Sequence, residues 1–329
     1  MASQLNPILR HTDLWYEDGN VVIVADRTAF KVHRTILSQH SLVFADMFSF
    51  PQPATNPDES YDGCPMVQVS DNATDMAIVL DIFYNGVTYL LARTQPTWKV
   101  VRAMALLGLK YQADRIRNEA VHQLSLVYGS RDVDEICSMQ PGVDCMSLED
   151  DDFISIVNVI RSLDLSRKWL VLALYDCCQM EAALIVNGLP STERLSPADV
   201  VRCVEARSEL VDLSRDIMED WFAEQCSSSE DRDLEGPCSA FSTCERILAQ
   251  LRRVRLPARS KRLAKHDPLL IHCELAETWF FESCASLCVP CATYYKRRDS
   301  EARQHILASL DSYFHFPEDN EMTDVTSDS

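Results

Sequence analysis

The chain has 329 residues, of which 47% are hydrophobic and 25% are charged, and its net charge is −19 at pH 7. These values are ordinary for a globular protein of about two domains. So negative a charge argues against nucleic acid or an anionic membrane as a partner of the whole protein, because both attract a positive surface.

Neither a membrane span nor a secretory signal is evident in the sequence. No apolar run approaches the ~20 residues that cross a bilayer, and the N-terminal residues lack the basic and apolar regions of a signal peptide. We therefore expect no membrane partner and a cytoplasmic or nuclear location. The 13 cysteines are then expected to be thiols in a reducing compartment.

Residues 1–12 form a short N-terminal segment with few apolar anchors, and the first regular elements follow it. A β-branched run at 21–24 lies between polar turn residues, and apolar residues alternate with a lysine over 30–32. This pattern predicts two strands paired as a hairpin. Over 36–48 the apolar residues recur at three- and four-residue steps around Ser41, a suitable N-cap, which predicts two short helices.

The following stretch returns to a strand and then to helices. Residues 51–65 contain four prolines and predict a surface loop, after which 66–69 predict a third strand. A helix is expected over 71–86, ending at a glycine. Two more amphipathic helices are expected over 98–109 and 113–127.

This order of residues resembles the BTB (POZ) domain family. The matches are a Phe-x-x-His-basic motif followed by Leu and Ser-x-x-Phe, a Tyr-x-Gly end of a central helix, and a Lys-Tyr pair. The resemblance implies an α+β fold, with a BTB/POZ domain of a small three-stranded sheet and α-helices over 13–130. The chain resembles the fungal type, which has a helical C-terminal extension. The matching residues, expected to have structural roles, are Asn20, Phe30, His33, Arg34, Leu37, Ser41, Phe44, Tyr84, Gly86 and Tyr111.

The resemblance also bears on two polar positions. It implies that His33 belongs to a strand-to-helix corner and is not a catalyst. At position 20 the family often has an aspartate that pairs with the basic residue matching Arg34, and this chain has Asn20 instead. A buried guanidinium without an anion costs on the order of several kcal/mol. We therefore expect Arg34 to find another acceptor or to stay solvated, and recognition that needs the charged pocket, such as corepressor binding, is disfavoured.

The rest of the chain is expected to be helical. A boundary precedes it at 142–152, where Pro141-Gly142 is followed by acidic residues, and few glycines follow. The expected segments are a helical extension over 150–225, a polar linker over 226–240, a C-terminal helical region over 241–316 and a disordered acidic tail over 317–329. Helices are predicted at 153–160, 169–180 and 197–222, and again from about 241, 268 and 299.

Four C-terminal cysteines are candidates for a metal site. Cys288 and Cys291 have the two-residue spacing that lets thiolates hold one Zn²⁺, and Cys284 lies one helical turn earlier. A reliable zinc module needs a second close pair, however, and Cys273 is isolated. The sequence therefore favours unliganded cysteines, several of them in a helical core, over a metal site or a redox pair. We expect no metal and no cofactor.

A basic stretch over 252–265 stands out in this acidic chain. It could be a nuclear-import signal or a nucleic-acid contact. The favoured alternative is a solvated connection, because no aromatic residue lies within it for base stacking. Its basic residues are Arg252, Arg253, Arg255, Arg259, Lys261, Arg262 and Lys265.

The sequence contains no catalytic signature. Phosphate-binding loops, the Gly-x-Ser-x-Gly turn and His-Glu-x-x-His are missing, and only eight glycines are present, so we predict a non-enzyme. The predicted function is a protein–protein interaction adaptor acting through the BTB domain. Homodimerisation is left open, because many relatives exchange an N-terminal helix longer than residues 1–12.

Two narrower functions remain as alternatives. The first is a substrate adaptor of a cullin-type ubiquitin ligase, with a cullin scaffold as partner. The hydrophobic-x-Glu element that often marks this role is absent, since residues 49–53 read Ser-Phe-Pro-Gln-Pro. The second is a nuclear, transcription-related regulator that uses the basic stretch, although no DNA-reading motif accompanies it.

Overall fold

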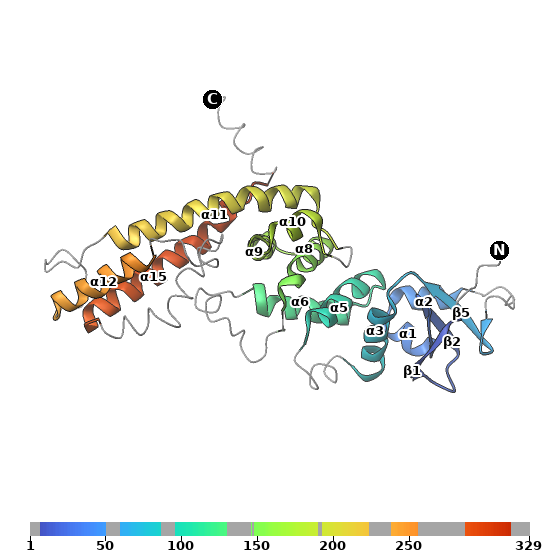
Figure 1. Cartoon of the computed structure of the whole chain (residues 1–329). Coiled ribbons are helices and arrows are strands. Elements are labelled where there is room, and N and C mark those ends of the chain that lie inside the picture. The colour runs from blue at the N-terminus through green and yellow to red at the C-terminus, as the bar shows by residue number, and fades with distance from the viewer. Residues whose placement is uncertain are drawn as a thin grey trace, which may run out of the picture. The chain divides into compact units, whose positions relative to one another are not determined.

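The computed structural model of the chain (Figure 1) divides into two compact units. Residues 1–130, with 143–152 and 159–165, form the N-terminal unit, and residues 131–142, 153–158 and 166–329 form the helical unit. The structure describes residues 7–50, 60–86, 96–129, 146, 148–189, 193–223, 238–255 and 287–316. The expected tail at 317–329 and most of the expected linker lie outside these residues.

A five-stranded mixed sheet forms one layer of the N-terminal unit. Its strands are β1 (Leu9–Trp15), β2 (Val21–Ala25), β3 (Thr28–Val32), β4 (Ser60–Tyr61) and β5 (Cys64–Val69), in the order β1-β3-β2-β5-β4. β2 is antiparallel to β3 and parallel to β5. All five residues of β2 are fully buried, as expected for a central strand with both faces covered.

The predicted hairpin is confirmed, and the predicted number of strands is wrong. Ala25 pairs with Thr28 across a two-residue turn, in which Asp26 adopts a left-handed φ of 49°, as tight hairpins require. The expected sheet of three strands lacks the two edge strands β1 and β4. Most β1 side chains face solvent and β4 has two residues, so neither shows the apolar alternation that identifies a strand.

Helices complete the N-terminal unit, as Figure 1 shows from α1 to α6. They are α1 (Arg34–His40), α2 (Leu42–Ser49), α3 (Ala73–Asn85), α5 (Trp98–Lys110) and α6 (Asp114–Tyr128). α3 begins at Asn72, whose side chain accepts hydrogen bonds from two backbone N–H groups of the first turn, and it ends at Gly86 with φ 84°. These ends confirm the helix expected over 71–86.

The helical unit contains the longer helices. The expected helix from residue 197 is confirmed as α11, and the one from 241 as α12. The helix expected from residue 299 begins ten positions earlier, at Val289, where Pro290 lies in the first turn and favours initiation. α10 was not expected. The described helices after residue 150 are α8 (Phe153–Ser162), α9 (Arg167–Cys178), α10 (Ala182–Asn187), α11 (Pro197–Ala223), α12 (Phe241–Arg255) and α15 (Val289–Ser309).

The end of the described chain packs onto α9 and α11. Arg167 pairs with Asp311 at 3.0 Å, and the Arg202 side chain donates to the carbonyl of His315. Both guanidinium groups lie over the ring of Phe316, 4.3 and 4.7 Å from its centre. These contacts join the end of the described chain to the helical unit. A sheet-containing unit and a helical region together give the α+β architecture that the sequence predicted.

Among the described helices, none combines the length and apolar character that a membrane crossing needs.

Candidate functional site

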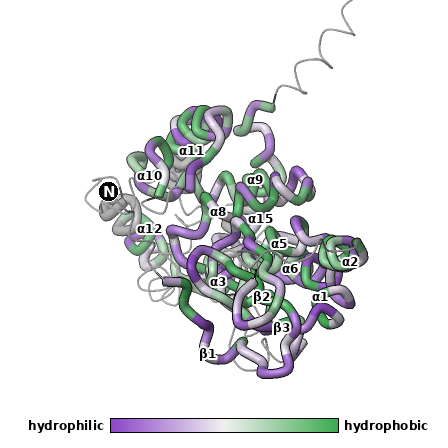
Figure 2. The backbone as a smooth tube through the Cα atoms, turned by 90° about the vertical axis from the view of Figure 1, so that its right-hand side faces the viewer, coloured by the Kyte–Doolittle hydropathy of each residue, from purple (hydrophilic) through white to green (hydrophobic). Residues whose placement is uncertain are grey.

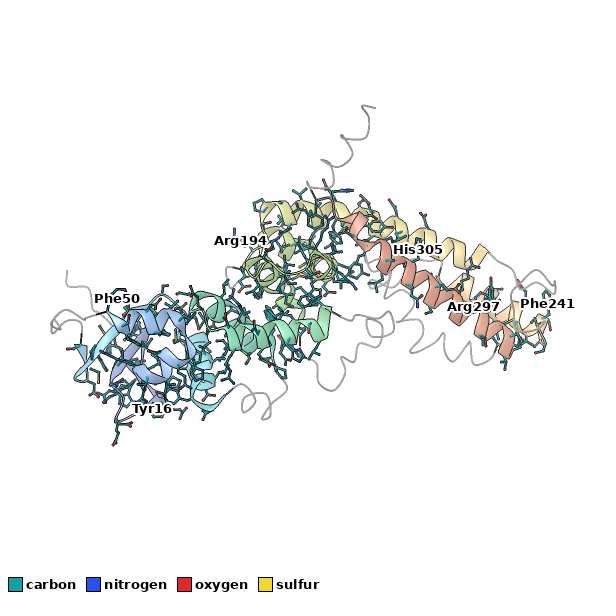
Figure 3. All side chains as sticks on the ribbon, turned by 180° about the vertical axis from the view of Figure 1, so that it is seen from behind. Tyr16, Phe50, Arg194, Phe241, Arg297 and His305 are labelled. Atoms are coloured by element: carbon teal, nitrogen blue, oxygen red, sulfur yellow. The ribbon has the colours of Figure 1, made fainter. Side chains whose placement is uncertain are left out.

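Helix α2 presents an unusually apolar surface. Six of its eight residues are apolar, yet Phe44 is its one buried residue, and in Figure 2 its tube is largely green. Leu42 is 58% exposed, and Phe50, just past the helix end, is 69% exposed and projects from the edge of the unit in Figure 3. We define the α2 surface as Leu42, Val43, Met47, Phe48 and Phe50, which are exposed or half-buried.

The inward side of α2 is firmly anchored. The ring of Phe44 stacks on Tyr111, with centroids 4.7 Å apart. The Ser41 hydroxyl accepts from the backbone N–H of Phe44 and donates to the carbonyl oxygen of Tyr111 at 2.6 Å. Ser41 therefore caps α2 and ties it to the end of α5 at once. The α2 surface is presented on a rigid support.

A carboxylate fixes Tyr111 in turn. Its hydroxyl donates to Asp71 at 2.5 Å, and Lys110 pairs with the same carboxylate at 2.7 Å. Burial and this hydrogen bond raise the pKa of Tyr111 far above its usual range, so the hydroxyl stays a donor. Asp71, at the start of the helix expected over 71–86, and the Lys-Tyr pair at 110–111 thus meet in space.

His33 lies in a corner built from aromatic side chains. Its backbone N–H donates to the hydroxyl oxygen of Tyr84 at 2.9 Å, and its Nδ1 is 2.8 Å from the same oxygen. Tyr84 stacks on Tyr16 with centroids 4.4 Å apart. Burial raises the pKa of Tyr84 to about 12, which keeps its hydroxyl neutral. His33 thus has the contacts of a structural corner residue.

Asn20 and Arg34 do not form a charged pair. The Asn20 side-chain oxygen accepts a hydrogen bond from the backbone N–H of Arg34 at 2.8 Å. Asn20 therefore caps the start of α1 through the backbone of Arg34 and not through its guanidinium group. The Arg34 guanidinium lies 5.5 Å from the centre of the Phe48 ring, and its buried Nε has no acceptor within the described structure. Arg34 therefore places a positive charge at the edge of the α2 surface.

Of the remaining motif residues, Phe30 and Leu37 lie in the core and Gly86 is exposed. Phe30 and Leu37 are fully buried, next to the strand-to-helix corner at His33, while Gly86 provides the left-handed end of α3. None of them reaches the surface as a binding group.

The cysteines are arranged differently from expectation. Cys288 and Cys291 lie together with Cys238 and Cys244, and all four sulfur atoms are within 4.8 Å of one another. The sequence interpretation missed the second pair because it lies more than 40 positions earlier; its only local signal is two cysteines flanking the start of a predicted helix at 241. Cys273 and Cys284 lie outside the described residues.

The basic stretch is mostly outside the described structure. The backbone of α12 extends through Arg255, and the rest, 256–265, is not among the described residues. Its role stays a prediction.

Comparisons with known proteins bear on the N-terminal unit. The family model for the BTB/POZ domain matches residues 15–125, which include the sheet from β2 onward and helices α1 to α5. A search of curated proteins finds no match to this chain.

Proposed function

Because residues 15–125 form a BTB/POZ domain, which is a protein–protein interaction module, we propose that this protein is a non-catalytic adaptor whose α2 surface binds a protein partner. The helical unit binds a second protein. The adaptor thereby brings two proteins together without chemistry of its own.

The exposure of α2 carries this proposal. Leu42 and Phe50 are exposed at the ends of a helix whose other side is fixed to Tyr111. The other residues of the α2 surface are half-buried beside them. Contiguous apolar surface of this kind, rimmed by polar groups, is typical of interaction sites. Large side chains such as Phe50 and Met47 are also the types that interfaces concentrate.

Charge at the rim suggests the chemistry of the partner. Arg34 forms no ion pair with another described residue, and it lies beside Phe48. A partner segment with an apolar face and a carboxylate at its edge would cover the α2 surface and pair with the guanidinium. Such pairing favours correct partners over wrong ones.

The absence of catalysis is supported by what the ionisable groups of the N-terminal unit do. His33 contacts Tyr84 through Nδ1 and the exposed carboxylate of Asp18 through Nε2, at 3.2 Å. Asp71 contacts Tyr111 and Lys110. Each of these groups holds a helix or corner in place. Their neighbours are therefore structural partners, not groups poised for acid–base chemistry.

The helical unit offers a second apolar surface. Val201 and Val204 are about half exposed on one face of α11, at 53% and 50%, and Val186 of the adjoining α10 is 56% exposed. Residues three apart on a helix lie on the same side. We assign the second partner to this α10–α11 surface.

Two matched variants test the proposal. Leu42→Asp with Phe50→Asp changes the α2 surface, and Val201→Asp with Val204→Asp changes the α10–α11 surface by the same charge. Both should melt within a few degrees of the parent, because exposed substitutions alter stability by about 0.5 kcal/mol or less. Partners captured by the full-length chain are then compared by mass spectrometry.

We expect the α2 variant to lose one set of partners and the α11 variant a different set. An α2 variant that is folded and retains every partner would contradict the proposal. Light scattering adds a readout for self-association: a parent dimer that becomes monomeric in the α2 variant identifies the partner as a second copy of the chain.

The same capture experiment separates the narrower roles. A cullin scaffold among the α2-dependent partners would establish a ubiquitin-ligase adaptor, and transcription proteins would establish a nuclear regulator. Cytoplasm and nucleus are both proposed as locations, and fluorescence of the tagged chain distinguishes them.

A further inference from the structure

A cluster of four thiols lies at one end of the helical unit, apart from the surfaces described above. Cys238 precedes α12 and Cys244 lies in its first turn, while Cys288 is the N-cap of α15 and Cys291 lies in its first turn. Figure 3 shows α15 running away from the region of Phe241, past Arg297 and His305. Both helices therefore begin at the cluster.

The sulfur atoms converge on a single point. All four lie within 4.8 Å of one another, and the Cys238 and Cys288 sulfurs are 3.6 Å apart. A tetrahedral zinc ion with zinc–sulfur distances of about 2.3 Å places its ligand sulfurs about 3.8 Å apart. The observed spread requires adjustments of about 1 Å or less to match that geometry.

From this convergence we propose that Cys238, Cys244, Cys288 and Cys291 together bind one Zn²⁺ ion. Four thiolates are a soft, tetrahedral ligand set that suits zinc. Four protein ligands leave no open position, so the site is structural and not catalytic. A two- or four-iron cluster fits less well, because its ligands bind different iron atoms and lie further apart.

The surroundings favour thiolate ligands. The N-terminal ends of α12 and α15 both carry partial positive charge, which stabilises nearby anions. The backbone N–H of Cys288 points to the Cys244 sulfur at 3.4 Å. Backbone N–H groups aimed at ligand sulfurs are the kind of outer contact that orients metal ligands.

The plain alternative is that the cysteines are small apolar residues of a core. Cys244 and Cys291 are buried with Ile247, Leu248 and Tyr295, which such residues would also be. Core packing does not require four sulfurs to meet, however, and Cys238 and Cys288 are only partly buried. The convergence of all four is what a metal site requires and a core does not.

The sequence alone showed only one close pair of cysteines, Cys288 and Cys291, and a zinc module needs two. The second pair is Cys238 and Cys244, which lie at the start of α12. The ion would then join α12 to α15, whose described core cluster is small.

Metal content of the full-length chain tests the proposal. The protein is purified under reducing conditions, without chelator and with any metal-binding tag removed, and metals are measured by mass spectrometry. We expect one zinc ion per chain. Cys238→Ser with Cys244→Ser, and separately Cys288→Ser with Cys291→Ser, should each reduce zinc to near zero.

Two control variants use cysteines outside the cluster. Cys64→Ser in the N-terminal unit and Cys273→Ser with Cys284→Ser should both keep the full zinc content. Loss of zinc in the Cys273 and Cys284 variant, with retention in the Cys238 and Cys244 variant, would overturn the assignment.

A spectroscopic readout covers variants that fold poorly. Adding Co²⁺ to the reduced, metal-free parent should give the absorption of a tetrahedral site with four sulfur ligands, at one ion per chain. The single variant Cys238→Ser keeps three thiolates, so its cobalt spectrum should shift to that of three sulfurs. No zinc in the parent and no cobalt–thiolate band would sink the proposal.

Discussion

The N-terminal unit and the α12–α15 pair stabilise their folds by different means. In the first, all five residues of the central strand are fully buried, and Val22 and Val24 lie in a cluster of apolar residues that come mainly from the neighbouring strands. In the second, six buried residues form the described cluster, and two of these are cysteines. A large core can hold itself together by apolar burial, whereas a small one commonly needs a covalent or metal crosslink. We therefore expect the N-terminal unit to be stable by apolar burial alone and the α12–α15 pair to depend on the proposed ion.

Removing metal should have the largest effect on stability, and it should affect the α12–α15 pair but not the N-terminal unit. In small structural zinc modules, binding supplies an apparent folding free energy of about 10–16 kcal/mol. A strong chelator should therefore greatly increase amide hydrogen exchange in α12 and α15 and leave β2, β3 and α3 protected. If the amides of α12 and α15 were equally protected before and after chelation, the α12–α15 pair would be stable without metal.

Phe44→Ala should destabilise the N-terminal unit. The ring is 1% exposed and stacked on Tyr111, so its loss should cost about 3–5 kcal/mol and largely unfold the N-terminal unit. Phe50→Ala is the matched control, because its ring is 69% exposed and should change stability by about 0.5 kcal/mol or less. Denaturant unfolding measures both, and equal effects would place the core elsewhere.

Ser41→Ala should have an intermediate effect. It removes the cap of α2 and leaves the buried carbonyl of Tyr111 without its donor, which together cost about 2 kcal/mol. Ser49→Ala is the control, because Ser49 is exposed and donates only to the carbonyl of Asp46. A denaturation midpoint that is the same for both variants would mean that Ser41 does not tie α2 to α5.

The smallest effect is expected in the basic stretch. Replacing Arg252, Arg253 and Arg255 with Gln should leave the melting temperature nearly unchanged, since charged runs are usually solvated. A lowered melting temperature would contradict this. If the variant also fails to accumulate in nuclei where the parent does, the stretch acts as an import signal.

Local patterns in the sequence predicted much of the N-terminal unit. The hairpin at Ala25 and Thr28 follows from β-branched runs around polar turn residues, and the C-terminal end of α3 follows from Gly86. The Asn72 cap at the other end of α3 was not predicted. Edge strand β1 was not predictable in this way, because its exposed residues lack an apolar period.

Long-range features escaped the sequence for a different reason. The thiol cluster joins residues more than 40 positions apart, and no local spacing shows that the start of α12 meets the start of α15. The exposure of the α2 surface was equally hidden, because a run such as Leu42, Val43 and Phe44 has the same composition whether its side chains are buried or outward.

The central claim is that the N-terminal unit is an interaction module in its own right, and the most direct measurement uses it alone. Residues 7–129 contain all five strands and helices α1 to α6. This segment should melt cooperatively and capture the α2-dependent partners of the full chain, with capture lost in Leu42→Asp, Phe50→Asp. A segment that melts without cooperativity, or that folds and captures none of those partners, would contradict the account.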